Sequence, residues 1–392
     1  MTRATIPVKG AVLEWARTTR GLSVREAADL IKIRPEMLVD LEKDKQKPTS
    51  KVFDKMVRVY KRSESILLLA TPPKTEPLPK DYRTVAGLTA RLSPSTRLAI
   101  RQTQELQKYV SGLADDALEN RFSRLPTASV NQSPDNLAQQ FREFFDVSLN
   151  DQLSWSKAGT FPNWRQLIES HGLLVLLKKM PWKDCRGFSL LSEGTIPAIV
   201  VNSEDVEVAR SFTLFHELAH LALRRAGICV FAPSTQVEKW CNRFAAEFLV
   251  PSPSFVEYVR DIKPDADRTY DWPMAALQNM SNYYRVSRSV IALRLQELGL
   301  AIPDYYDQHR SELTSFDQRP KREEPIKIKK KPGWKEKQKL KEVGVRTASV
   351  ILDAWKHRIA DASEAADILN LSLSELHGLE KQTEAQRVRN VS

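Results

Sequence analysis

The sequence has 392 residues, of which 42% are hydrophobic and 28% charged, as is typical of a globular protein with about two to four domains. No apolar run approaches the ~18 residues of a membrane span, and the N-terminal segment lacks an apolar signal-peptide core, so we expect a cytoplasmic protein without a membrane partner. The net charge of +11 is compatible with a nucleic-acid partner, and three cysteines, Cys185, Cys229 and Cys241, do not suggest a disulfide framework.

Short amphipathic helices are predicted over residues 10–70. Ser23 caps the second helix, and Glu26 three residues later completes a capping box. Pro35 is a favoured first residue for the third helix. The inner faces are expected to consist of Val12, Leu13, Trp15, Ala16, Ala27, Ala28, Leu30, Ile31, Leu38, Leu41, Val52, Phe53, Met56 and Val59.

The stretch from Leu22 to Lys43 resembles the XRE-type helix-turn-helix of phage-repressor-like regulators. The resemblance implies that the third helix enters the DNA major groove by its N-terminal residues. The matching positions hold two acids and no Lys, Arg, Asn or Gln, being Pro35, Glu36, Met37, Val39 and Asp40. Basic residues that could still contact DNA phosphates are Arg25, Lys32, Arg34, Lys43, Lys45 and Lys47. The sequence therefore leaves open whether this fold binds DNA or serves docking or homodimer formation.

The middle of the chain changes from helical to mixed character. Residues 72–79 form a proline-rich hinge, and helices are predicted over residues 92–113 and 135–145. A helix over residues 164–171 ends at His171, which we interpret as a helix-end residue rather than part of a site. Three short strands are then predicted, over residues 173–177, 187–191 and 198–201.

The segment His216-Glu217-Leu218-Ala219-His220 is an HExxH pattern, for which the chance of a random match in this chain is roughly 1 in 100. It falls in a helix predicted from Val206 to Arg225 and ended by Gly227. Residues i and i+4 share one helix face, so both imidazoles can bind one zinc ion, and Glu217 can act as general base. The alternative, a core helix with buried histidines, would leave three polar side chains beside an apolar face.

A catalytic zinc needs a third protein ligand and one open position. The helix predicted from Glu238 to Pro251 offers Glu238, with Glu247 as the competing ligand or a surface residue. Asn242 lies one turn beyond Glu238, where it could hydrogen-bond a ligating histidine. Cys241 could bind zinc, but a small buried residue is the simpler interpretation.

Residues 210–220 and 238–251 resemble the matching motifs of the ImmA/IrrE family of zinc metallopeptidases. The resemblance implies a zincin-like domain with His216, His220 and Glu238 as zinc ligands and Glu217 as catalytic base. Family members typically have alanine where Cys241 stands, and many carry a repressor-like N-terminal domain.

A peptidase of this kind would also need a group that steadies the oxyanion and a surface that holds the substrate. Tyr283 or Tyr284 could stabilise the oxyanion, although ordinary packing is the simpler role for both. An extended substrate could pair with an edge strand, which we expect at residues 198–201.

The C-terminal region combines a basic segment with a repeat. Residues 319–341 hold eleven Lys or Arg against three Glu, which indicates a solvated linker or a phosphate-binding strip. Residues 363–369 then echo residues 25–31, and Leu376, Leu379, Glu380 and Lys381 stand at the same offset as Leu38, Leu41, Glu42 and Lys43. We expect a second helix-turn-helix-like unit or, alternatively, a coincidence between alanine-rich helices. Its third-helix positions are poor DNA readers, being Leu373, Ser374, Glu375, His377 and Gly378.

The expected fold is mainly α with a small β-sheet (α+β). Five segments are predicted: a helix-turn-helix domain (1–71), a hinge and helical connector (72–145), a zinc metallopeptidase domain (146–318), a basic linker (319–344) and a C-terminal helical unit (345–392).

This predicted domain organisation is compatible with two functions. The leading hypothesis is a zinc endopeptidase that cleaves a regulatory protein, such as a repressor or antitoxin, in a stress, mobile-element or toxin–antitoxin circuit. The alternative is a DNA-binding transcriptional regulator or antitoxin that uses its metallopeptidase domain as sensor or scaffold. The HExxH pattern with Glu238 favours the enzyme.

Overall fold

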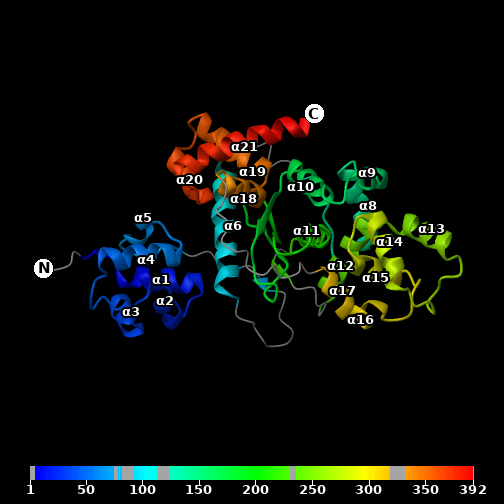
Figure 1. The fold of residues 1–392 in the computed structure, drawn as a ribbon, viewed down its shortest axis with the longest axis horizontal. Helices are drawn as coiled ribbons and strands as arrows, with labels where there is room; N and C mark the ends of the chain where they lie inside the picture. Colours follow the sequence, from blue (N-terminus) through cyan, green and yellow to red (C-terminus); the bar gives the residue numbers. More distant parts are fainter. Residues whose placement is uncertain are drawn as a thin grey trace. The chain divides into compact units, whose positions relative to one another are not determined.

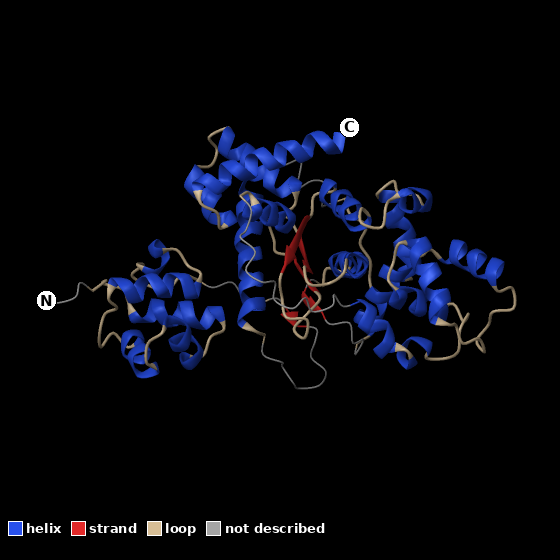
Figure 2. Ribbon diagram, in the orientation of Figure 1, coloured by secondary structure: helices blue, strands red, loops and turns tan. Residues whose placement is uncertain are grey.

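The computed structural model describes residues 5–74, 78, 80–81, 92–113, 124–225, 227–229, 235–317 and 332–391. The chain divides into two compact units, one of residues 1–78 and 90–101 and one of residues 79–89 and 102–392. The structure is mainly helical with one small sheet, as expected (Figure 2). Within the described ranges, no helix is long and apolar enough to cross a membrane.

The first unit is a bundle of short helices (Figure 1). They are α1 (Gly10–Arg20), α2 (Val24–Ile31), α3 (Pro35–Glu42), α4 (Ser50–Tyr60) and α5 (Glu64–Leu67). The predicted capping box is present, since the Ser23 hydroxyl accepts from the backbone N–H of Glu26 and the Glu26 carboxylate accepts from that of Ser23. Leu30, expected on the inner face, is instead 57% exposed. The inner face of α2 is narrow, and Ala27, Ala28 and Ile31 fill it.

Helices α1 and α3 approach closely and are joined by a buried ion pair. The Arg17 guanidinium donates to both carboxylate oxygens of Glu42, at 2.7 and 2.9 Å, and to the carbonyl of Leu22. Gly10 makes the approach possible, because a Cβ at this position would lie 2.2 Å from the carbonyl oxygen of Glu42.

The second unit contains a five-stranded mixed sheet with the order β1-β5-β3-β4-β2. The strands are β1 (Lys80–Asp81), β2 (Leu174–Lys178), β3 (Gly187–Leu190), β4 (Ala198–Asn202) and β5 (Gly227–Cys229). β2 runs parallel to β4, whereas β3 runs antiparallel to both of its neighbours, β4 and β5. β2, β3 and β4 are buried along their whole length, which explains their nearly continuous apolar sequences.

Helices surround the sheet and build the main core. Central among them are α10 (Thr160–Ser170), α11 (Glu207–Ala222) and α12 (Gln236–Leu249), with α11 packed on β3 and β4. Trp164 of α10, Phe215 of α11 and Phe248 of α12 meet in one aromatic cluster, with ring centroids 4.0–5.4 Å apart.

The second unit has further helices before its C-terminal region. They are α8 (Pro134–Phe144), α9 (Leu149–Ser154), α13 (Ser252–Ile262), α14 (Met274–Tyr284), α15 (Arg288–Glu297), α16 (Tyr305–Gln308) and α17 (Arg310–Asp317), and α6 (Pro94–Leu113) belongs in part to each unit.

Two expectations about this region are wrong. The helix that carries HExxH ends at Ala222, where Leu223 caps it and Arg224 takes a left-handed conformation. Gly227 is therefore not its end but the first residue of β5. Residues 198–201 do not form an edge strand either, because β4 lies between β3 and β2. Strand order depends on pairing between distant segments, which local patterns do not reveal.

The C-terminal region contains α18 (Trp334–Val343), α19 (Val345–Lys356), α20 (Ala362–Leu369) and α21 (Leu373–Val391). α20 repeats α2 closely: both have eight residues and a capping box, and Asn370 takes the left-handed conformation that Lys32 takes after α2. The repeat seen in the sequence therefore corresponds to a structural repeat, whose α21 begins at the position equivalent to the start of α3.

Part of the expected basic linker is folded. Residues 319–331 lie outside the described residues, but residues 334–343 form α18 instead of a linker. α18 packs against β2, where the buried ammonium of Lys178 binds the Glu342 carboxylate and Arg165 donates to the carbonyl of Lys341 at 2.7 Å. Apolar anchors at Leu340 and Val343 explain why this lysine-rich stretch is helical.

We expect Gly10→Ala to destabilise the first unit by about 1–3 kcal/mol, because the new methyl group would overlap the backbone of Glu42. Gly112→Ala is the matched control: a Cβ there meets nothing within 4 Å, and alanine in a helix stabilises by roughly 0.5 kcal/mol. Hydrogen exchange should show faster opening of α1 and α3 in Gly10→Ala alone. Unchanged exchange in α1 and α3 would contradict the tight contact.

Candidate metal centre

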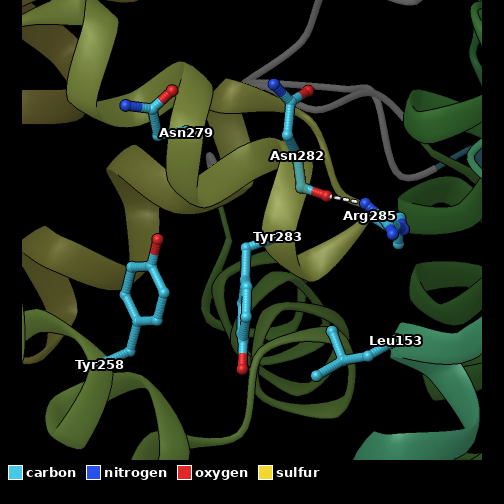
Figure 3. A pocket seen from close by; sticks show the side chains of 6 residues that line it. All are labelled: Leu153, Tyr258, Asn279, Asn282, Tyr283 and Arg285. Atoms are coloured by element: carbon cyan, nitrogen blue, oxygen red, sulfur yellow. Dashed lines mark hydrogen bonds between the residues drawn. The ribbon is translucent and has the colours of Figure 1, made fainter.

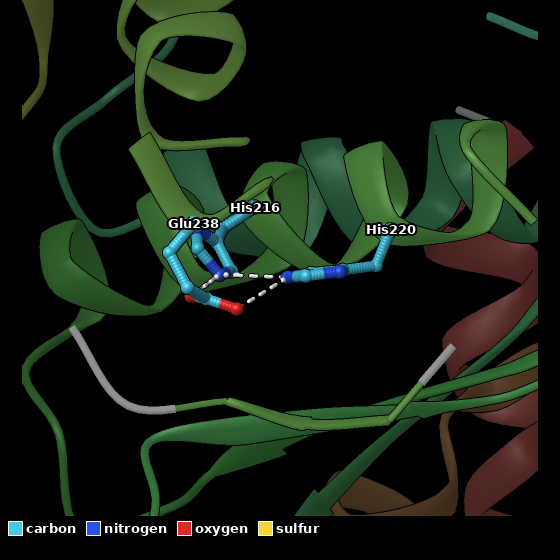
Figure 4. Close-up of side chains that lie close together, drawn as sticks. All are labelled: His216, His220 and Glu238. Atoms are coloured by element: carbon cyan, nitrogen blue, oxygen red, sulfur yellow. Dashed lines mark hydrogen bonds and ion pairs between the residues drawn. The ribbon is translucent and has the colours of Figure 1, made fainter. Parts of the chain in front are cut away.

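Three side chains from two helices meet in the interior of the second unit (Figure 4). His216 and His220 project from one face of α11, with their Nε2 atoms 3.2 Å apart. The Glu238 carboxylate comes from the first turn of α12, with Oε2 3.2 Å from Nε2 of His216 and Oε1 3.3 Å from Nε2 of His220. All three residues are at most 1% exposed.

The position of Glu238 follows from how α12 begins. Thr235 caps the helix, and its hydroxyl accepts from the backbone N–H of Glu238 at 3.2 Å. α12 packs along α11, so the first turn of one helix faces the middle of the other. Glu238, which lies 18 residues after His220 in the sequence, thus brings its carboxylate opposite the two imidazoles.

The spacing of the three groups fits a tetrahedral metal ion. An ion with bonds of about 2.0–2.1 Å holds neighbouring ligands about 3.3 Å apart, which is close to all three measured separations. Two imidazole nitrogens and a carboxylate are a common donor set for zinc, and burial of such groups is costly without a cation. The residues present therefore fit a metal ion with three protein ligands.

The electrostatics of Glu238 reflect the same arrangement. Burial alone raises the pKa of its carboxyl, but the hydrogen bonds and charges of His216 and His220 outweigh burial and lower that pKa to about 2. Glu238 is therefore ionised across the physiological pH range and contributes the negative charge that a cation requires.

Glu217 lies next to this cluster on α11 and is also buried, at 1% exposure. Its carboxylate sits against the start of β3, where a Cβ on Gly187 would lie 3.2 Å from Oε1 of Glu217 and 2.5 Å from Cγ2 of Thr213. Only glycine leaves this space open. The sequence analysis missed the role of Gly187, and the one signal for it was a glycine at the start of an apolar strand.

The competing ligand, Glu247, has a different environment. Its carboxylate binds Arg294, whose side chain is 1% exposed, and accepts from the backbone N–H of Ser252 at 2.9 Å and from the Ser252 hydroxyl. These contacts use both carboxylate oxygens. The structure thus brings Glu238, and not Glu247, together with the two histidines.

Cys241 and Asn242 lie about one turn beyond Glu238 on α12, and neither has a described bond to the cluster. Cys241 is fully buried, and burial, reinforced by the charges of Glu238 and Glu217, raises the pKa of its thiol well above the ordinary value. It therefore stays protonated, as expected for a packing residue. Asn242 makes no hydrogen bond through its buried Oδ1 with any described residue, so its predicted bond to a histidine is not seen.

Tyr283 and Tyr284 lie at the end of α14, and neither has a described contact with the cluster. The Tyr284 hydroxyl is 3.1 Å from the hydroxyl of Ser254, and burial raises the pKa of Tyr284 to about 12. The ring of Tyr283 packs on Tyr258, with centroids 4.6 Å apart, at a pocket of about 360 Å³ (Figure 3). These contacts fit the packing alternative. The pocket is lined by Leu153, Tyr258, Asn279, Asn282, Tyr283 and Arg285.

His171 caps the C-terminal end of α10, as expected. Its Nδ1 lies 2.9 Å from the carbonyl oxygen of Leu167, and its ring packs against Phe144 and Phe145. A structural role accounts for this histidine.

The basic residues proposed to contact DNA fall into two groups. Lys45 pairs with Asp40 at 3.4 Å and Lys47 pairs with Asp44 at 2.5 Å, so each already has an acidic partner within the unit. The other four are exposed and, among the described residues, have no ion-pair partner, these being Arg25, Lys32, Arg34 and Lys43. They lie at the start of α2, in the turn, and at both ends of α3.

Two protein-family models match separate parts of the chain. Residues 168–296 match the Peptidase_M78 model, described as the IrrE N-terminal-like domain, and residues 13–67 match a helix-turn-helix model. The first match contains every residue of the cluster and the second contains α2 and α3. The resemblances stated from the sequence are thereby confirmed for these two stretches, and the chain has a metallopeptidase-like domain and a DNA-binding type of domain. A comparison with curated proteins found no match.

We expect the purified chain to hold about one zinc ion, and Glu238→Gln to lower zinc affinity by more than about 100-fold, since a direct ligand matters more than its hydrogen-bond partners. Glu247→Gln is the control. It should keep the metal but lose roughly 3 kcal/mol of stability, because buried Arg294 loses a charged partner. Atomic absorption and urea unfolding measure the two effects, and the reverse pattern would make Glu247 the ligand.

The metal-free protein should lose stability in acid through Glu238. Its carboxyl has a pKa of about 2 in the folded chain against an ordinary 4.5, so the ionised form stabilises the fold above pH 4.5. This contribution, on the order of 3 kcal/mol, fades as the pH falls from 4.5 toward 2. Urea unfolding of wild type and Glu238→Gln should converge over that window. A stability difference that stays constant down to pH 2 would refute the assignment.

Proposed function

We propose that this chain, which combines a helix-turn-helix domain with an IrrE N-terminal-like peptidase domain, is a zinc-dependent endopeptidase that cleaves a regulatory protein. The observation that carries the proposal is the buried triangle of His216, His220 and Glu238 with Glu217 beside it. Three protein ligands leave a fourth tetrahedral position open, as catalytic zinc sites do and structural sites do not.

Each residue has a defined part in this proposal. His216, His220 and Glu238 would hold zinc, which supplies a Lewis acid that lowers the pKa of water and polarises a peptide carbonyl. Glu217 accepts a proton from the attacking water and later donates it to the leaving amine. Gly187 leaves the space in which the Glu217 carboxylate sits. Burial of the cluster keeps these interactions in a medium of low dielectric constant, where they are strong.

The choice of a regulatory protein as substrate rests on the helix-turn-helix domain. A peptidase that carries such a domain can be localised to DNA or to a partner with the same fold. A repressor or an antitoxin can be reached in either way, because such a protein can bind DNA and can itself have a helix-turn-helix fold. We therefore propose that the protein acts in a stress, mobile-element or toxin–antitoxin circuit of the cytoplasm and forms a homodimer through the same domain.

A second function is favoured by a separate observation. Arg25, Lys32, Arg34 and Lys43 are exposed and have no ion-pair partner among the described residues, so they are available to DNA phosphates. A transcriptional regulator or antitoxin that uses the metal centre as a sensor or scaffold would need these residues and would not need Glu217. The acids Glu36 and Asp40 on α3 weaken sequence reading, although Asp40 is itself paired with Lys45.

The substitution Glu217→Gln separates the two functions. We expect it to retain zinc and to lower cleavage by roughly 10²–10⁴-fold, the usual contribution of a general base. The assay co-expresses the full chain with repressors and antitoxins from the same genome and follows their cleavage by mass spectrometry. If wild type and Glu217→Gln both bind zinc and neither cleaves, the enzyme hypothesis fails. Full biological activity of Glu217→Gln would favour the sensor.

A further inference from the structure

A pocket of about 360 Å³ lies at the end of α14 and shares no lining residue with the metal cluster (Figure 3). Its lining comes from α9, α13 and α14 and consists of two tyrosines, two asparagines, one leucine and Arg285, which caps α14. Sites for small molecules have volumes of about 300–1,000 Å³ and combine apolar surface with a few polar groups, and this pocket has both properties. The peptidase chemistry proposed above does not use it.

Two tyrosines form the aromatic part of the pocket. The rings of Tyr258 and Tyr283 have centroids 4.6 Å apart and are tilted by 35°, and Figure 3 shows the Tyr283 ring between Tyr258 and Leu153. Tyr283 is 43% exposed, so a large part of its ring is open to a ligand. Burial raises the pKa of Tyr258, and its hydroxyl, which has no described hydrogen bond, therefore stays protonated. This part of the pocket fits a flat ring with a polar edge.

The polar part of the pocket carries positive charge. Arg285 donates through Nε to the carbonyl of Trp155 at 3.2 Å and through Nη1 to the carbonyl of Asn282, which leaves Nη2 without a described acceptor. Lys157 donates to Oδ1 of Asn282 at 3.1 Å, so a second cation stands beside the pocket. Among the described residues neither cation has an ion-pair partner, and none of the lining residues is acidic. An anionic group would therefore meet two cations without a competing carboxylate.

The walls of the pocket are held in place by buried contacts. Gln152, which precedes Leu153 on α9, is fully buried. Its amide donates to the carbonyls of Leu249 at 2.9 Å and Tyr284 at 2.8 Å, which fixes α9 against the ends of α12 and α14. The Tyr284 hydroxyl lies 3.1 Å from that of Ser254, which joins α14 to α13. The three helices that line the pocket are thus fixed without a ligand, and binding costs little ordering of the backbone.

We propose that this pocket binds a small molecule that combines a planar aromatic ring with an anionic group. The ring stacks on Tyr283, and the anion is held by Arg285 and Lys157. Asn279, whose side chain has no described hydrogen bond, can bind polar atoms at the edge of the ring. Aromatic carboxylates and mononucleotides share this chemistry. The site is separate from the metal centre, so ligand binding does not depend on cleavage of a protein.

Isothermal titration calorimetry of the full chain tests the proposal with two panels of probes. One panel holds AMP, GMP, CMP and UMP, and the other holds 4-hydroxyphenylacetate, indole-3-acetate and salicylate. Adenosine and indole are controls with a ring and no anion, and phosphate and acetate are controls with an anion and no ring. We expect at least one panel to bind, which assigns the ligand to nucleotides or to aromatic acids, and each control to bind at least about 10-fold more weakly.

Two substitutions locate the site. Arg285→Asn removes the guanidinium but preserves the left-handed backbone, because Asn370 adopts the same conformation in this chain, with φ of 52° against 60°. Tyr283→Ser removes the stacking ring from an exposed position. Arg358→Asn is the matched control, since Arg358 also has a left-handed backbone, with φ of 59°, and does not line the pocket. We expect affinity to fall at least about 10-fold in Arg285→Asn and about 5-fold in Tyr283→Ser, and to stay within about 2-fold in Arg358→Asn.

The outcomes are separable from those of the cleavage assay, because binding is measured without a protein substrate. Urea unfolding shows that each variant is folded, and Tyr283→Ser decides the test alone if Arg285→Asn does not fold. Binding by neither panel overturns the proposal. Binding that both pocket variants retain in full also overturns it, since the ligand would then sit elsewhere, for instance on the metal centre.

Discussion

The central constraint on the second unit is that the imidazoles of His216 and His220 and the carboxylate of Glu238 are buried together and need a shared partner. Two imidazole nitrogens and one carboxylate lie 3.2–3.3 Å from one another in the interior, where uncompensated polar groups are costly. A cation at their centre satisfies all three. Three features of the fold build this centre: α11 and α12 pack side by side, Thr235 caps α12 directly before Glu238, and Gly187 leaves the space in which the Glu217 carboxylate sits.

Much of this centre could be predicted because helix periodicity is local. HExxH places two histidines on one face whatever the rest of the chain does. The choice between Glu238 and Glu247 could not be made on local grounds, since it depends on Arg294, which lies 47 residues after Glu247 and occupies its carboxylate. The same holds for β5. A strand of three residues shows too little sequence pattern to be predicted, and its partners β3 and β1 lie far from it in the sequence.

The repeated helix pair shows how one sequence pattern can serve two structural roles. α2 and α20 share their length, capping box and left-handed end residue. The start of α21 is nevertheless covered by α18: Lys335 pairs with Glu375 at 2.6 Å, and Glu336 lies against Gly378. In the C-terminal copy, Glu375 and Gly378 at the start of α21 thus contact α18, whereas Leu373, Ser374 and His377 remain exposed. The offset of the repeat was readable in the sequence, whereas these contacts with α18 were not.

The central claim is that a zinc ion binds to two histidines and Glu238 with one position left for water. X-ray absorption at the zinc edge of the purified wild-type chain tests it most directly. The account predicts nitrogen and oxygen neighbours only, at about 2.0–2.1 Å, with the scattering of two imidazole rings. A sulfur neighbour at about 2.3 Å, which would implicate Cys241, or four protein ligands with no water would contradict it.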